Sequence, residues 1–164
     1  MSHAQIDDAE MFAEELLIFV MNVSSRRSSS RNLRPCCSSS PLTTSIQFAV
    51  RLFLEQRDET IRNIFNALLD QGDLNRHFRS FASTMAVLVT VRGYSDMDFV
   101  VFSAVICKLA VLAFANNFKT CLSHAVTAIV EAVRLFKLTG AFTSDSWDKM
   151  SRAVLFNPQS ICLL

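Results

Sequence analysis

The sequence predicts an all-α domain, and three observations lead to this prediction. Apolar residues recur at spacings of three and four in most segments. Only three Gly and three Pro are present, too few for the turns of a fold with many short strands. The segment 96–115 is apolar nearly all round, so the other helices, which have one apolar face each, have to enclose it. We therefore expect one domain, residues 1–164, folded as a globular bundle of seven or eight helices around a central hydrophobic hairpin, residues 96–136.

Composition narrows the class of protein without naming a function. Hydrophobic residues make up 51% of the chain and charged residues 19%, which excludes a disordered acidic or basic tail and provides enough apolar material for a core. Sixteen Lys and Arg stand against fifteen Asp and Glu, a net charge of +1. This balance predicts no general affinity for nucleic acid or for a membrane surface.

The first third of the chain is expected to form a helix and a loop. Ser2 and Gln5 fit a capping box, and the apolar residues after them predict a helix to about Val23. Residues 24–42 are then expected to form a flexible loop within the domain, because eight Ser and four Arg lie between residues 24 and 40 with almost nothing apolar. Its arginines would suit a basophilic kinase or RNA, but a solubilising role is the simpler interpretation.

The middle of the chain is expected to form three helices. One begins near Thr44 and breaks at the polar residues 55–59, and the next carries Ile61 and Phe65 on one face. Gly72 provides a left-handed end for it, and Asp73 caps the third, which ends at Gly93.

The central helix, residues 96–115, opens with a second capping box, Ser95 with Asp98. Lys108 lies in its middle, and a Lys at the centre of a bilayer costs roughly 2.5–3.5 kcal/mol. We therefore expect a buried helix with its Lys at a water-facing position, and no transmembrane anchor. A returning helix to Gly140 follows, and then a short helix capped by Thr143 or Ser144.

The sequence shows no arrangement of residues that is typical of catalysis or of metal binding. There is no Gly-rich phosphate loop, the three His are scattered, and no pair of carboxylates lies at helical spacing among apolar residues. The five cysteines are Cys36, Cys37, Cys107, Cys121 and Cys162. Because their number is odd and their spacing is not that of metal ligands, we expect reduced thiols. We expect no enzymatic activity, no cofactor and no metal site.

Two short segments and the order of elements resemble a known family. Residues 81–88, Phe-Ala-Ser-Thr-Met-Ala-Val-Leu, look like the helix before the first homology motif of the B-cell lymphoma 2 (Bcl-2) family. Residues 147–150, Trp-Asp-Lys-Met, are similar to its second homology motif. An opening helix, a long loop, amphipathic helices, an apolar hairpin and a short helix with a lone Trp follow the order of that family from about Ala9 to Phe156.

The sequence departs from the family at its signature motif. Asn-Trp-Gly-Arg should fall at residues 95–98, where this chain has Ser-Asp-Met-Asp. The family's Arg pairs with an Asp of the bound helix, so Asp98 would repel that Asp unless Arg92 or Arg51 substitutes. These departures suggest a divergent viral pro-survival homologue, located in the host cytoplasm or brought to the mitochondrial surface through its partners.

The resemblance implies an inhibitor of host-cell apoptosis that sequesters the Bcl-2-homology-3 helix of a pro-apoptotic protein, for example Bim, in a hydrophobic surface groove. The residues expected at the groove are Phe48, Arg51, Leu52, Ile61, Phe65, Phe78, Phe81, Met85, Leu88, Val89, Arg92, Asp98 and Phe102. The residues expected to support the fold are Gly93, Trp147, Asp148 and Met150.

Two alternatives stay open. Each apolar groove candidate can equally be an ordinary core residue, in which case the protein is a dimerising structural or adaptor bundle that binds no death motif. A groove left empty would also expose an apolar face through which two copies could form a homodimer. An RNA-binding protein that uses Arg26–Arg34 is a further alternative. The rest of the chain has no excess of basic residues to support it, so no nucleic-acid partner is expected.

Overall fold

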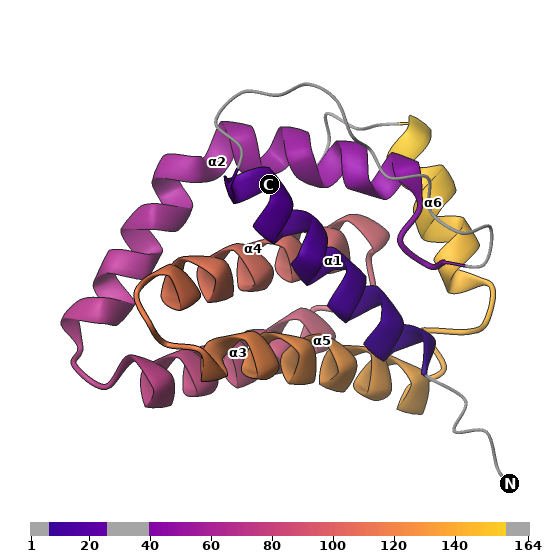
Figure 1. Cartoon of the computed structure of the whole chain (residues 1–164). Helices are drawn as coiled ribbons and strands as arrows, with labels where there is room; N and C mark the ends of the chain where they lie inside the picture. Colours follow the sequence, from indigo (N-terminus) through magenta and orange to yellow (C-terminus); the bar gives the residue numbers. More distant parts are fainter. Residues whose placement is uncertain (1–6, 26–39, 157–164) are drawn as a thin grey trace, which may run out of the picture.

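The computed structural model describes residues 7–25 and 40–156, and every regular element in them is an α-helix. The all-α prediction is confirmed, with six helices in the described residues where seven or eight were expected (Figure 1). In chain order the helices are α1 Asp8–Ser25, α2 Thr44–Asp70, α3 Leu74–Val91, α4 Asp96–Ala115, α5 Thr120–Leu138 and α6 Ser146–Phe156. The Ser2–Gln5 capping box and most of the expected loop lie outside the described residues.

Helix α4 lies at the centre and contacts each of the other five helices (Figure 1). Helices α3 and α5 lie side by side and run in the same direction. At their first turns the Thr120 hydroxyl donates to Asn75 Oδ1 at 2.6 Å, and near their ends the ring of Tyr94 packs edge-on against Phe136. Helix α4 connects them and runs the opposite way. Helix α1 packs across α4 and α5, and α6 packs against α2 and α4.

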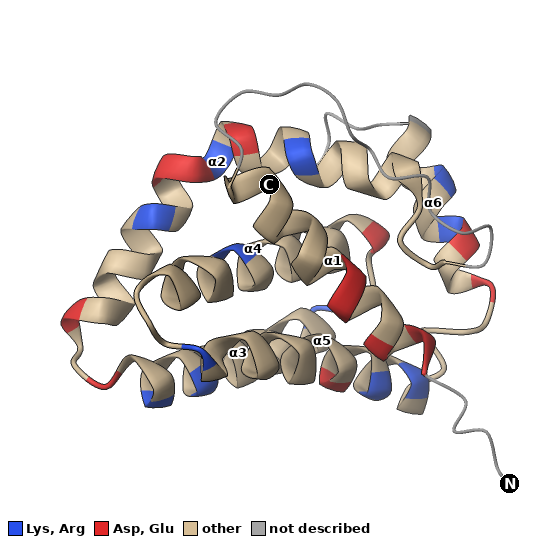
Figure 2. Ribbon diagram, viewed as in Figure 1, with Lys and Arg blue, Asp and Glu red and all other residues tan. Residues whose placement is uncertain are grey.

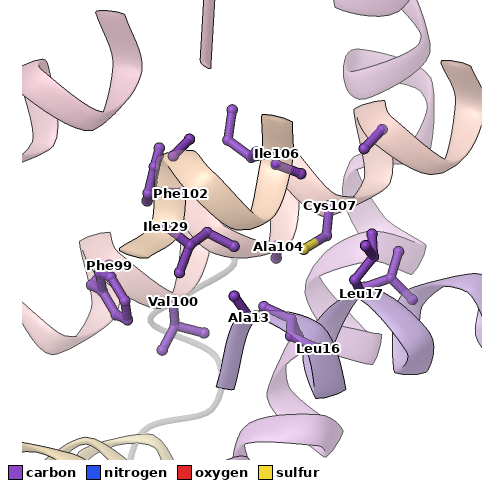
Figure 3. Close-up of a cluster of buried hydrophobic side chains, with 14 of the residues drawn as sticks. Ala13, Leu16, Leu17, Phe99, Val100, Phe102, Ala104, Ile106, Cys107 and Ile129 are labelled. Atoms are coloured by element: carbon purple, nitrogen blue, oxygen red, sulfur yellow. The ribbon is translucent and has the colours of Figure 1, made fainter. Parts of the chain in front are cut away.

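The apolar composition of α4 is explained by its position. Figure 3 shows Ala13, Leu16 and Leu17 of α1 near Val100 and Cys107 of α4, all of them buried. In the described part of the chain α4 is the one helix long and apolar enough to cross a membrane by length and composition, and 67% of its most apolar window is buried by the rest of the protein.

The predicted break at residues 55–59 is wrong, because α2 is one helix of 27 residues. Its polar segment contains Glu, Gln and Arg, which are good helix formers, and ion pairs at i, i+4 spacing span it. Arg51 Nε lies 3.1 Å from Glu55 Oε1, and Arg62 Nε lies 2.7 Å from Asp58 Oδ2. Figure 2 shows acidic and basic residues following one another along α2.

Most of the predicted helix ends are confirmed. Gly72 has φ +105°, a conformation that other residues rarely adopt, and Asp73 accepts a hydrogen bond from the Arg76 N–H at the start of α3. Ser95 Oγ accepts from the Asp98 N–H at the start of α4. Before α6, the Thr143 N–H donates to Ser146 Oγ at 2.8 Å, so the chain turns there before the helix begins.

A cluster of aromatic rings holds α6 on the bundle. The ring of Trp147 lies 5.0 Å from that of Phe12 in α1 and 4.9 Å from that of Phe142. Met150, one turn further on, is fully buried, whereas Asp148 is exposed and only its backbone carbonyl accepts a bond from Arg152. Trp147 and Met150 therefore attach α6 to the core.

Candidate functional site

Helix α3 carries a row of apolar side chains that the core covers only in part. Phe78 and Val89 are buried, but Phe81 and Met85 are half-buried and Leu88 is 50% exposed. Phe81, Met85 and Leu88 follow at i, i+4 and i+7, so they form one row along the helix. Both Phe81 and Met85 pack against the core at the edge of the row.

This row lies on the side of α3 that is turned away from α5. On the opposite flank of α3, Asn75 bonds Thr120 of α5. Burial, and then the charge of Arg79 on α3, lower the pKa of His124 of α5. Since Asn75 and Arg79 face α5, helical geometry places Phe81, Met85 and Leu88 on the other flank.

Helix α4 has a second half-buried apolar row, which the sequence analysis missed. Its members are Val101, Val105 and Leu112, which are spaced four and seven residues apart and therefore lie on one side of α4. All three are partly buried and pack against the core. Lys108, which pairs with Asp58 of α2, lies next to this row on α4. Phe99, which packs on Phe136 of α5, lies on the opposite side of α4. In a helix that is apolar all round, only the charges of Asp98 and Lys108 mark this side in the sequence.

The two rows combine into one candidate surface. Helices α3 and α4 are antiparallel and joined by only four residues, 92–95. Leu88 therefore lies at the Asp98 end of α4, and Phe81 lies towards Leu112. We call Phe81, Met85, Leu88, Val101, Val105 and Leu112 the α3–α4 strip. Helix α2 borders it, because α2 packs along α4 and contacts α3 much less (Figure 1).

The other groove candidates lie elsewhere. Five of them are core residues with little exposed surface: Ile61, Phe65, Phe78, Val89 and Phe102. Phe48 is 49% exposed, and Leu52 follows it at i+4. Because Ile46 and Val50 are the buried face of this part of α2, Phe48 lies about 160–200° around the helix from them, so the structure does not bring it to the strip.

Of the two arginines named as substitutes for the missing motif Arg, Arg51 is separate from the strip, whereas Arg92 follows Leu88 at i+4 and continues the α3 row at its end. Arg51 pairs with Glu55 on the same helix. Arg92 ends α3, where its backbone N–H donates to the Leu88 carbonyl, and it is exposed. Gly93 follows with φ +89° and allows the sharp turn into α4.

Asp98 is half-buried at one end of the strip. Among the residues that the structure describes, its carboxylate is in none of the ion pairs. Asp96, two residues earlier, differs because it accepts a 2.5 Å hydrogen bond from the Tyr94 hydroxyl. That carboxylate and burial raise the pKa of Tyr94, burial more strongly.

The water-facing position expected for Lys108 is wrong, because its side chain is buried with only 8% exposed. Its Nζ lies 3.4 Å from Asp58 Oδ1 of α2 and donates to Ser24 Oγ of α1 at 3.0 Å. A hydrogen bond from Arg62 and the charge of Lys108 lower the pKa of Asp58. The cation is thus held at the junction of three helices.

The described residues contain no group of three His, Cys, Asp or Glu that could hold a metal ion. Cys107 and Cys121 are free and buried. Burial raises the pKa of the Cys121 thiol to about 11 and that of Cys107 further, so neither thiol is activated as a nucleophile. Cys36, Cys37 and Cys162 lie outside the described residues.

Comparisons with protein-family models, with curated proteins and with solved structures give no match for this chain. The candidate surface is therefore defined by this chain's own residues: two half-buried apolar rows, a carboxylate at one end and a buried cation where α4 meets α2.

Proposed function

We propose that this chain binds an amphipathic helix of a pro-apoptotic protein along the α3–α4 strip and so inhibits apoptosis. The observation that carries the proposal is the incomplete cover of α4. Most of α4 is buried, but Val101, Val105 and Leu112 are only partly buried, beside the row on α3. Two adjacent apolar rows at helical spacing suit the anchors of an incoming helix at i, i+3 or i+4, and i+7.

The apolar anchors of a helical ligand would supply most of the binding energy at the strip, because the strip's own side chains are already partly buried. Each large anchor that is exposed in the free ligand and becomes fully buried contributes roughly 1.5–3 kcal/mol. Several of them can offset the loss of freedom on association, which is of order 4–15 kcal/mol. Met85 also suits varied anchors, because its side chain is flexible and polarisable.

The choice of a pro-apoptotic partner is supported by the order of the elements. A central apolar helix enclosed by amphipathic ones, and a short last helix attached through a single Trp, agree with the Bcl-2 resemblance. With the strip as ligand site, the chain would keep a death-motif helix from its target without any catalytic step.

A peptide panel tests the proposal. Fluorescently labelled death-motif helices are titrated with the protein, and at least one is expected to bind with a Kd below about 1 μM. Met85→Glu and Val105→Glu place a charge in the strip and are expected to weaken binding by more than about tenfold.

Phe48→Glu is the matched control. Phe48 is half-exposed on the outer side of α2, so the same kind of change there should leave both folding and binding intact. Far-UV circular dichroism establishes that each variant is folded. Binding of no peptide, or equal losses in Phe48→Glu and Met85→Glu, would contradict the proposal and favour a structural bundle.

A further inference from the structure

Asp98 is an acidic residue at the end of the α3–α4 strip, and no ion pair within the described residues provides it with a counter-charge. Its backbone N–H is used in the cap of α4, but its carboxylate takes part in no ion pair of residues 7–25 and 40–156. The nearest acid in sequence, Asp96, has the Tyr94 hydroxyl as partner. Arg92 precedes the turn and forms none of these pairs.

The position of Asp98 relative to the strip follows from helical geometry. Asp98, Val101 and Val105 are spaced by three and four, so they lie on one side of α4. Asp96 lies about 160–200° around the helix from Asp98. The first turn of α4 stabilises a negative charge, but it supplies no side-chain cation.

A helix that covers the strip also removes water from Asp98. A half-buried carboxylate that becomes buried without a counter-charge is costly, whereas a Lys or Arg from the ligand compensates for the lost water. An Asp or Glu in the same place adds repulsion between like charges. The charge of the ligand at this one point therefore affects its affinity.

We infer that Asp98 makes the strip selective for partner helices that carry Lys or Arg where they pass the first turn of α4. This inference rests on the proposed function. A helix with an acid at that point is bound less tightly than its variant with Lys, so the selectivity is set by charge at one end and by shape along the rest.

Two synthetic amphipathic peptides test the inference. They share the same four leucines at helical spacing and differ only beside the first and last leucine, where one has Lys and the other has Glu. Changing both ends makes the result independent of the direction in which the peptide binds. We expect the Lys peptide to bind about tenfold more tightly at low salt, with a difference that shrinks as salt screens the charges.

Variants of the protein assign this difference to Asp98. Asp98→Asn is expected to bring the two affinities within about twofold of each other, and Asp98→Lys to reverse their order. Asp96→Asn removes the same charge from the same turn, but on the other side of the helix, and should leave the preference unchanged.

The outcomes separate the inference from the proposed function. Equal binding of both peptides to the wild-type protein, or a preference that persists in Asp98→Asn, overturns the role of Asp98 while leaving helix binding in place. Binding of neither peptide overturns the inference, and the proposed function falls with it if no death-motif helix of the panel binds either. If Asp98→Lys fails to fold, Asp98→Asn decides the question, since it keeps the size of the side chain and the backbone bond to Ser95.

Discussion

Lys108 of α4 and Asp58 of α2, fifty residues apart, form an ion pair with Nζ and Oδ1 3.4 Å apart inside the helical bundle. The lysine is almost completely buried, while the aspartate is 41% exposed. Ser24 Oγ accepts a second hydrogen bond from the same Nζ. The pair therefore connects the end of α1, the middle of α2 and the centre of α4.

Removing either partner of this pair should have different effects on stability. Asp58→Ala leaves a buried ammonium group with only the Ser24 hydroxyl, and we expect it to lower the free energy of unfolding by about 2 kcal/mol, less than for a fully buried pair. Lys108→Met keeps the volume and removes the buried charge, so its effect should stay within about 1 kcal/mol. Urea denaturation followed by circular dichroism measures both.

Arg62→Ala is the control for the Asp58 variant. It removes the other cation that bonds Asp58 but leaves Lys108 paired, so a loss of no more than about 0.5 kcal/mol is expected. A larger loss for Lys108→Met than for Asp58→Ala would show that the aspartate does not compensate the buried lysine.

The same pair predicts how stability depends on pH. The hydrogen bond from Arg62, and then the charge of Lys108, lower the pKa of Asp58 below its usual 3.8 in the folded protein. A lowered folded-state pKa adds stability above the unfolded value, and this stability is lost as the pH falls through the folded value. Between about pH 5 and about pH 3 the wild type should therefore lose more stability than Asp58→Asn does.

Glu131→Gln provides the comparison for this acid effect. A hydrogen bond from Arg134 lowers the pKa of Glu131 as well, but that pair lies on the surface, where solvent weakens it. Glu131→Gln should therefore reduce the acid sensitivity less than Asp58→Asn. Identical acid profiles for the wild type and Asp58→Asn would refute the assignment.

The sequence predicts local features of this fold better than distant contacts. Gly72, Asp73 and Ser95 act as expected, because a helix end depends on residues within one turn. The buried position of Lys108 was not predictable, since its partners lie fifty and eighty-four residues away. The continuity of α2 is hidden for a related reason: the polarity of residues 55–59 predicts a break, whereas the charges in and beside this segment pair along the helix.

The candidate surface shows the same limit. On α3 the alternation of polar and apolar residues identified Phe81, Met85 and Leu88, but it could not separate them from the buried Phe78. On α4 nearly every residue is apolar, so no pattern distinguished Val101 and Val105 from their buried neighbours. Which apolar faces stay uncovered depends on how helices pack, and a single sequence does not specify that.

Trp147 should be a sensitive probe of the attachment of α6. Its ring packs on Phe12 and Phe142 with centroids about 5 Å apart. Trp147→Ala leaves a large cavity, and we expect a loss of about 3–5 kcal/mol in the free energy of unfolding. Trp147→Phe keeps part of the aromatic contact and should cost about half as much.

Trp147 is the only tryptophan in the chain, so its fluorescence reports this cluster alone. The folded wild type should emit at short wavelength because the indole is 8% exposed, and the emission should shift to longer wavelength with the same urea midpoint as the loss of helix. A shift at much lower urea would show that α6 detaches before the bundle unfolds.

The last turns of α3 expose apolar side chains, and we expect the protein to self-associate through them. Val87 and Leu88 are each 50% exposed and Val91 is 77% exposed, and the three lie within four residues of one another. Such exposed clusters favour burial against a second surface. In the absence of a helical ligand we therefore expect the wild type to form dimers at high concentration in sedimentation experiments, and Leu88→Glu with Val91→Glu to remain monomeric.

The same experiment distinguishes a dimer that uses the strip from one that uses only the end of α3. Leu88 belongs to both surfaces, whereas Val91 lies outside the strip. If dimers form through the strip, a bound death-motif peptide should dissociate them and Met85→Glu should prevent them, while Phe48→Glu should have no effect. Dimers that persist in Met85→Glu but not in Val91→Glu would place the interface at the end of α3. A monomeric wild type at all concentrations would contradict self-association through either surface.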